Sequence, residues 1–358
     1  MDKICVFCGS KPQSKNKEHV LPKWLIEHTG PVNRKVRFGF DKNTGKPREF
    51  SYNSFTFPAC ESCNTKFAEL ESLTKPALLK LLLSSTLSKH DFHILLDWFD
   101  KVRTGLWLGF YYLDKNIGKI EPKFQIASRI GLHDRMLHII RVDGNKDELS
   151  FRGCDMPSFY YTPSCFSIII NNYCFINISS PFLFSRRLGF PYPANSFFRN
   201  DGLADYEIKD CRKRIMHPLM RKPFKFKGTG IYQPMFRTQK MVPAYSVYYD
   251  NDYIKKNSIS FEHGIGEIFI ENNNNTEKVA STEFSTWVPS FSYDREGMNP
   301  EISTHTIELQ LLIDTFTPSH KKLPKKDQDW WKEMLRTNKS YGKYMIRILK
   351  DNARKMKP

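Results

Sequence analysis

The sequence predicts an α+β protein in four parts: a cysteine-containing N-terminal module, a helical extension, a β-rich α+β domain and a basic C-terminal helix. Two CxxC pairs lie near the N-terminus, and short strand-like segments fill the middle of the chain. Basic residues recur at helical spacing near the C-terminus. The length of 358 residues suggests two or three domains. We place the parts at residues 1–72, 73–118, 119–318 and 319–358.

The formal net charge of +17 favours a polyanionic partner, most often a nucleic acid. Residues 1–118 hold 18 Lys and Arg against 12 Asp and Glu, and residues 321–358 hold 13 against 4. No window approaches 18 uninterrupted apolar residues, and the N-terminus lacks the pattern of a secretory signal, so we predict no membrane span. We expect a cytoplasmic protein, in which paired cysteines are metal ligands rather than disulfides.

The two cysteine pairs predict a metal site. Cys5 and Cys8 lie three positions apart in CVFCG, which has the form of a tight knuckle. Cys60 and Cys63 repeat this spacing directly before a predicted helix. Four thiolates are the ligand set that tetrahedral zinc prefers, so we predict one structural Zn²⁺. Four unligated thiols or a redox pair are the alternatives, and neither accounts for the repeated spacing.

Zinc at these cysteines would hold the 51 residues between the pairs as a loop fixed at both ends. Glu18 and His19 lie early in this loop, and Pro22 limits the backbone after them. Asn64 lies at the start of the predicted helix. Hard divalent cations take oxygen ligands, and a neutral imidazole can take a proton from water. These are the parts of a metal-dependent phosphodiesterase.

The pattern CVFC…EHVLPKWL…CESCN resembles the HNH (ββα-metal) endonuclease family, in the branch where a four-cysteine zinc site supports the motif. The resemblance covers residues 1 to about 72 and implies a treble-clef-like ββα-metal fold. It implies that Glu18 and Asn64 bind a catalytic Mg²⁺ or Mn²⁺ and that His19 is the general base. It also implies a nucleic-acid substrate, with double-stranded DNA expected. Asn at the last motif position is also found in the HNH domain of RNA-guided effector nucleases.

One position departs from the family pattern. The middle asparagine, which orients the base, usually lies nine residues before the last motif position, where this chain has Phe55. Asn53 could take this role after a short shift in the hairpin. Glu69 and Glu71 follow on the predicted helix, and we interpret them as solvated or capping charges. The alternative function is a non-catalytic, zinc-stabilised module that binds nucleic acid or protein.

Two helices are predicted after the module, from TKPALLKLLLSSTL and SKHDFHILLDWFDKVRTGLW. Ser88 and Asp91 form a capping-box pattern at the start of the second helix. The apolar residues that follow recur at helical spacing, which predicts a buried face. They are Ile94, Leu95, Trp98, Phe99 and Val102.

Residues 119–318 are predicted to form the β-rich α+β domain. The clearest hairpin is CFSIIINNYCFINI (165–178), since Asn171 and Asn172 tolerate the positive φ of a two-residue turn. We interpret Cys165 and Cys174 as small apolar strand residues. Further predicted strands are MLHIIRV (136–142), YSVYYD (245–250) and GEIFIE (266–271), and the predicted breaks are PYPAN (191–195) and ENNNNTE (271–277).

The role of residues 119–318 is left open by the sequence. The region could sense a ligand, recruit a partner protein or form a homodimer. A small nuclease-like module joined to a large second region resembles the architecture of bacterial anti-phage effectors and of mobile-element nucleases.

Seven basic residues near the C-terminus follow steps of 4, 3, 4, 4, 3 and 4, close to the helical period of about 3.6 residues. They would form one stripe of roughly 33 Å, near the length of one DNA turn. Phosphate contacts along it would hold a duplex without reading its sequence. Gly342 weakens this helix and allows a break. The stripe consists of Lys332, Arg336, Lys339, Lys343, Arg347, Lys350 and Arg354.

A second basic segment, RKRIMHPLMRKPFKFKGTG (212–230), places aromatic residues between the charges. Phe224 and Phe226 could stack on the bases of a single strand. The alternative, which we favour, is a solvated loop whose Phe side chains are buried.

Overall fold

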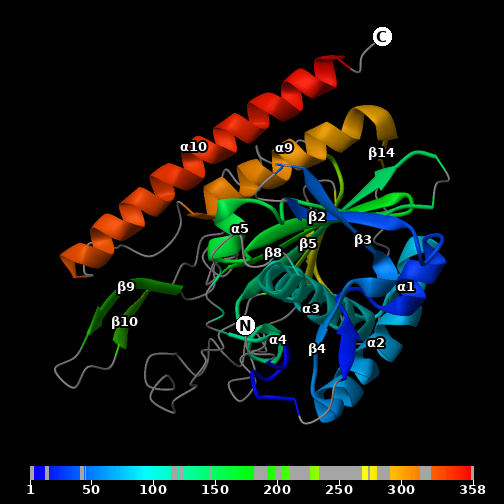
Figure 1. Ribbon diagram of the computed structural model, residues 1–358, viewed down its shortest axis with the longest axis horizontal. Helices are drawn as coiled ribbons and strands as arrows, with labels where there is room; N and C mark the ends of the chain where they lie inside the picture. The colour runs from blue at the N-terminus through cyan, green and yellow to red at the C-terminus, as the bar shows by residue number, and fades with distance from the viewer. Residues whose placement is uncertain are drawn as a thin grey trace.

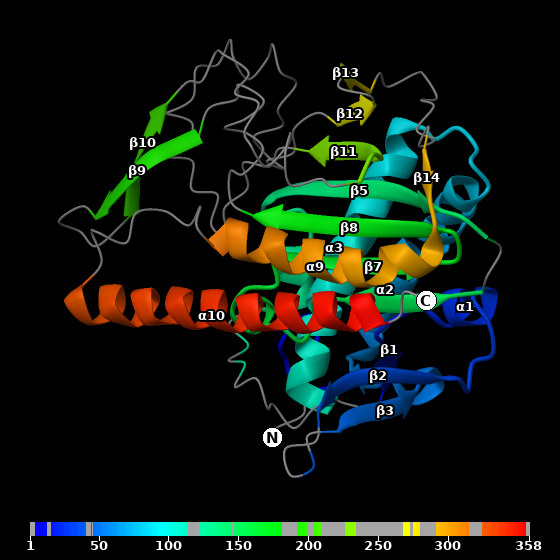
Figure 2. The same ribbon diagram turned by 90° about the horizontal axis from the view of Figure 1, so that it is seen from above.

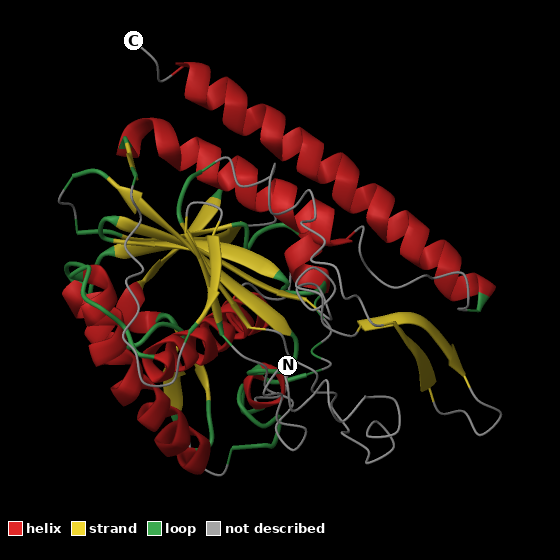
Figure 3. Ribbon diagram, turned by 180° about the vertical axis from the view of Figure 1, so that it is seen from behind, coloured by secondary structure: helices red, strands yellow, loops and turns green. Residues whose placement is uncertain are grey.

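An eight-stranded sheet forms the centre of the computed structural model, with α3 (Lys89–Leu113) packed on one face and α9 (Arg295–Asp314) on the other (Figures 1 and 3). The strands follow the order β13-β12-β11-β5-β8-β7-β6, and β14 pairs with β5 outside this order. The protein is therefore a mixed α+β structure, as predicted. The structure describes residues 4–12, 16–40, 44, 46–113, 120, 122, 124–144, 147–180, 192–198, 204–209, 226–233, 268–272, 275–279, 291–314 and 324–355.

Side chains of the central strands point alternately into two hydrophobic cores, one on each face of the sheet, as expected for strands that are buried on both faces. In β5, Leu137 lies in the same core as Trp98 of α3, whereas Met136 lies in the same core as Ile302 of α9. The strands are β5 (Asp134–Val142), β6 (Leu149–Arg152), β7 (Cys165–Ile170), β8 (Tyr173–Ser180), β11 (Thr229–Gln233), β12 (Phe269–Asn272), β13 (Asn275–Lys278) and β14 (Ser292–Tyr293).

The predicted hairpin at 165–178 is confirmed. Strands β7 and β8 pair antiparallel from Cys165 opposite Ile178 to Ile170 opposite Tyr173. Asn171, in the two-residue turn, has a φ of 51°, which an asparagine tolerates. Cys165 and Cys174 are both fully buried in these strands and act as small apolar residues.

Two predicted breaks are wrong. PYPAN lies largely in β9 (Tyr192–Phe198), which pairs with β10 (Ala204–Lys209) as a two-stranded ribbon with a register shift after Glu207. Pro193 lies opposite Ile208, at this register shift and on an edge strand, where a proline is tolerated, so PYPAN can be extended. In ENNNNTE, Asn272 and Asn275 pair between β12 and β13, so strand structure extends into the predicted break; residues 273 and 274 lie outside the described residues. The predicted strand at 245–250 lies outside the described residues.

Both helices predicted after the module are present. The first is part of α2 (Glu61–Leu82), which begins within the second CxxC pair and continues past Pro76. Helix α2 therefore crosses the boundary that we placed between residues 72 and 73. The second is α3, and its capping box is confirmed: Asp91 Oδ2 accepts from the Ser88 backbone N–H at 2.9 Å, and Ser88 Oγ accepts from the Asp91 N–H at 3.1 Å. The apolar set from Ile94 to Val102 is buried.

The N-terminal residues form short elements around α2. The Tyr52 hydroxyl donates a 2.5 Å hydrogen bond to the carbonyl of Leu149, which ties this module to the β6 edge of the sheet. None of the described helices combines the length and the apolar character needed to cross a bilayer. These N-terminal elements are β1 (Lys17–His19), α1 (Lys23–His28), β2 (Lys35–Phe40), β3 (Pro47–Ser51), η1 (Tyr52–Ser54) and β4 (Thr56–Pro58). Two further short helices lie later in the chain, α4 (Ile126–Arg129) and α5 (Pro157–Tyr161).

The C-terminal helix α10 (Lys325–Lys355) lies along α9 without a break (Figure 2). The break that we considered possible at Gly342 is absent because this glycine is a packing residue. It is buried, and a Cβ atom there would lie 2.7 Å from Cδ1 of Leu311 on α9. Asn338, 2% exposed, donates to Asp314 at 3.0 Å and adds a polar contact between the two helices.

Gly342→Ala is expected to stabilise the protein by less than the about 1 kcal/mol that alanine brings at an exposed helical glycine, because the added methyl group must displace the Leu311 side chain. Chemical denaturation would measure the free energy of unfolding. In a Leu311→Ala background this contact is gone, so the same substitution should show a larger gain; equal effects in both backgrounds would contradict this packing.

Candidate metal centre and nucleic-acid surface

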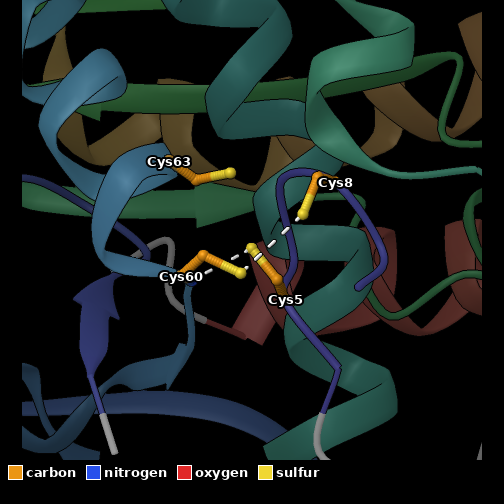
Figure 4. A group of neighbouring side chains, drawn as sticks. All are labelled: Cys5, Cys8, Cys60 and Cys63. Carbon is orange, nitrogen blue, oxygen red and sulfur yellow. Dashed lines mark hydrogen bonds between the residues drawn. The ribbon is translucent and has the colours of Figure 1, made fainter. Parts of the chain in front are cut away.

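The four predicted zinc ligands lie together (Figure 4). Cys5 and Cys8 belong to the N-terminal turn, while Cys60 and Cys63 belong to the start of α2. Their four sulfur atoms all lie within 4.8 Å of one another, and Figure 4 shows them turned toward a shared space. The turn is closed by Gly9, whose φ of +80° disfavours any side chain and whose N–H donates to the Cys5 carbonyl at 2.8 Å.

The cluster has the dimensions of a tetrahedral metal site. Metal–sulfur distances of about 2.3 Å place the sulfur atoms of a tetrahedron about 3.8 Å apart, and the sulfur atoms of Cys8 and Cys60 are 3.9 Å apart. Desolvation and neighbouring thiols raise the pKa of Cys60 to about 11 and of Cys63 to about 12. Burial would raise the pKa of Cys8 too, but hydrogen bonds, first from Ser10, lower it to about 7. A bound cation would remove the repulsion between thiolates, so the four cysteines fit a metal ion.

His19 and Asn64 each have a buried polar atom without a hydrogen-bond partner among the described residues. These atoms are Nε2 of His19 and Oδ1 of Asn64. His19 ends β1 and pairs with Thr56 of β4, and β4 leads directly into α2, whose first turn holds Asn64. A buried polar atom without a partner costs about 1–3 kcal/mol. A ligand or ion bound at each of these atoms would supply the missing partner.

Glu18 is held by a lysine that sequence reasoning had given no role. The Nζ atom of Lys101, on α3, lies 3.2 Å from Oε1 of Glu18, and the lysine side chain is 2% exposed. The same ammonium group pairs with Glu71 of α2. Burial raises the pKa of Glu18; Lys101 opposes this shift and Glu71 adds to it.

Glu71 is therefore not the solvated or capping charge that we predicted, whereas Glu69 is exposed. Two signals in the sequence point to the ion pair. Glu71 follows Asn64 by seven residues, two helical turns on the same face of α2. Lys101 lies between Trp98 and Val102, which are both buried. A lysine on this buried side of the helix needs an acidic partner.

The middle motif position differs from the family pattern in the structure as well. The ring of Phe55 is buried, and its carbonyl accepts the backbone N–H of Val20 at 3.1 Å. Asn53 lies in η1 and its side chain is exposed. Among the described residues, the four cysteines are the one group of three or more His, Cys, Asp and Glu whose ligand atoms lie close enough to share an ion.

All seven residues of the predicted basic stripe are exposed on α10. The side of α10 that packs against the protein carries Met345 and Leu349 instead. Three of the seven lie near acidic side chains of the same helix at 3.7–4.0 Å: Lys332, Arg336 and Arg354. The central four, Lys339, Lys343, Arg347 and Lys350, have no ion pair with any described acidic residue.

The second basic segment lies mostly outside the described residues, which include only 226–230 of it. Phe226 is 4% exposed and contacts Tyr293 and His305 edge to face. Its ring is therefore in the core and does not stack on bases, as the solvated-loop interpretation predicts for this residue.

Comparison with protein-family models, with curated proteins and with solved structures finds no match to this chain. The residues of the site therefore have to carry the functional assignment.

Purified protein should hold one tightly bound metal ion per chain, and Cys63→Ser should lower that content by about tenfold or more. Elemental analysis after gel filtration measures it. Cys174→Ala is the matched control, because this cysteine is buried in β8 far from the cluster in sequence. Equal metal content in the Cys63 variant and the wild type would show that the cluster is not the binding site.

Proposed function

We propose that the chain is a metal-dependent endonuclease of the HNH (ββα-metal) type that hydrolyses phosphodiester bonds, with double-stranded DNA as its substrate. The observation that carries the proposal is the pair of buried, unpartnered atoms, Nε2 of His19 and Oδ1 of Asn64. They belong to the strand and the helix beside the cysteine cluster. The cluster binds structural Zn²⁺, and β1, β4 and α2 form the treble-clef-like ββα module.

His19 acts as the general base in this proposal. Its unpartnered Nε2 accepts a proton from the attacking water, and the antiparallel pairing with Thr56 fixes the backbone that carries the imidazole. Asn53, exposed in the turn before β4, is the residue proposed to orient the imidazole, and it would have to turn toward His19 to do so. Glu18 and Asn64 offer oxygen ligands to Mg²⁺ or Mn²⁺. When bound, such an ion neutralises charge on the phosphate and on the leaving 3′ oxygen.

His19→Ala is expected to reduce plasmid cleavage in Mg²⁺ or Mn²⁺ by about 10²–10⁴-fold, the usual contribution of a general base. Gel electrophoresis of supercoiled plasmid measures nicking and linearisation. His28→Ala is the matched control, because His28 is an exposed histidine of the nearby helix α1. Equal cleavage by wild type and His19→Ala would remove His19 from the mechanism.

The exposed stripe of α10 supports a phosphate-binding role in the same proposal. Seven basic side chains lie on one side of a 31-residue helix, and the central four have no described acidic partner. Their positive charge is complementary to the negative charge of a nucleic-acid backbone. Contacts to phosphate give affinity that falls with salt and carry no sequence information.

Replacing Lys339, Lys343 and Arg347 by Gln should weaken duplex binding and reduce the slope of log affinity against log salt by about 3, one per lost phosphate contact. Fluorescence anisotropy with a labelled duplex at several salt concentrations measures both quantities. The control carries the same charge change at exposed sites away from α10 and from the second basic segment: Lys46→Gln, Lys75→Gln and Arg141→Gln. An equal loss in both triple variants would mean that only total charge matters.

Two observations favour a second candidate, a zinc-stabilised nucleic-acid-binding module without catalysis. The Glu18 carboxylate is already paired with Lys101, and Phe55 replaces the middle asparagine. The plasmid assay separates the two candidates: salt-sensitive binding without cleavage at any Mg²⁺ or Mn²⁺ concentration supports the binding module.

A further inference from the structure

Lys101 brings a positive charge into the protein interior between two carboxylates of different elements. Its side chain is 2% exposed, and its ammonium contacts Glu18 of β1 and Glu71 of α2. The same ammonium lies 5.7 Å from the centre of the Phe7 ring, next to the cysteine cluster. Removing an ammonium group from water costs several kcal/mol, so such a group persists only with well-placed partners.

An ion pair between α2 and α3 alone would not require Lys101. The two helices are already joined by Lys80 and Asp91, 3.2 Å apart at a partly exposed site. Lys101 differs because it reaches beyond α2 to Glu18, the neighbour of His19 in β1. With both carboxylates ionised, the two carboxylates and one ammonium carry a net charge of −1, which attracts a further cation.

The face of α2 that meets Lys101 also carries Asn64. Asn64 and Glu71 lie two turns apart on this face, with Phe67 between them. Phe67 stacks on Phe7 at 4.1 Å between ring centres. One helix face thus links the cysteine turn, the unpartnered amide of Asn64 and the carboxylate that holds Lys101.

We propose that Lys101 is a positioning residue of the nuclease centre and that Glu71 holds it in place. By donating to Oε1 of Glu18, the ammonium fixes the carboxylate, whose other oxygen, Oε2, would then be available to bind the divalent ion. Hydrogen-bonded partners of this kind orient metal-binding carboxylates, and their loss weakens metal binding by about 10–100-fold. The inference rests on the proposed function.

The test measures Mn²⁺ binding to the zinc-loaded full-length chain by electron paramagnetic resonance, without reference to cleavage. Lys101→Met should weaken Mn²⁺ binding by about 10–100-fold, and Lys101→Arg, which keeps a donor and the charge, should recover part of the loss. Lys80→Met is the matched control, since it removes the other ion pair between α2 and α3 and should bind Mn²⁺ as the wild type does.

Unchanged Mn²⁺ affinity in Lys101→Met, with a lower melting temperature, would make the ion pair purely structural and overturn the proposal. Tighter binding would overturn it too, because the ammonium would then compete with the ion for Glu18. If Lys101→Met does not fold, Glu71→Gln decides: weaker binding supports the proposal and wild-type binding overturns it. Failure of the wild type to bind Mn²⁺ would instead reject the proposed centre, and this inference with it.

Discussion

Helix α3 carries charged side chains into the interior on more than one side, and each must find an opposite charge there. Asp100 lies 3.1 Å from Arg135 of β5, and Arg103 pairs with Asp100 and donates to Asn177 of β8. Lys101 turns instead toward the N-terminal module and Glu18. Breaking one buried pair leaves a charge that costs about 3–5 kcal/mol. These pairings therefore allow few arrangements of the module, the helix and the sheet, and they place the candidate centre.

The cysteine cluster and α3 have complementary roles in this arrangement. Strands β1 and β4 have three residues each and make too few hydrogen bonds to hold His19 in place by themselves. A metal at the cluster would tie the N-terminal turn to α2, and the stack of Phe7 on Phe67 packs that turn against the same helix. Lys101 then attaches α3 to β1. The short strands are held from both sides, so a site of few residues can be rigid.

Local spacing explains which features the sequence predicted. Cysteine pairs, the Asn171–Asn172 turn and the basic stripe are patterns within a few residues, and all three appear in the structure as a cluster, a hairpin and an exposed helix face. The Lys101–Glu18 pair joins residues 83 positions apart; the sequence around Lys101 indicates that a buried lysine needs an acidic partner, but it does not indicate which one. At Gly342 the local signal is misleading. Helix propensity alone allows a break there, but α10 is continuous and the glycine lies close against Leu311 of α9.

The attachment of α10 bears on how a phosphate-binding surface could serve the centre. Met345 and Leu349 pack on the core that contains the module, and together with Val36 and Tyr52 they border a cavity of about 520 Å³. The basic stripe is thus held in a fixed position relative to the module and is not joined to it by a flexible linker alone. A rigid surface that contacts only phosphates can align the nucleic-acid backbone with a catalytic site, but it does not determine the sequence at which the site cuts. Any selectivity of the proposed nuclease must therefore come from groups outside the stripe.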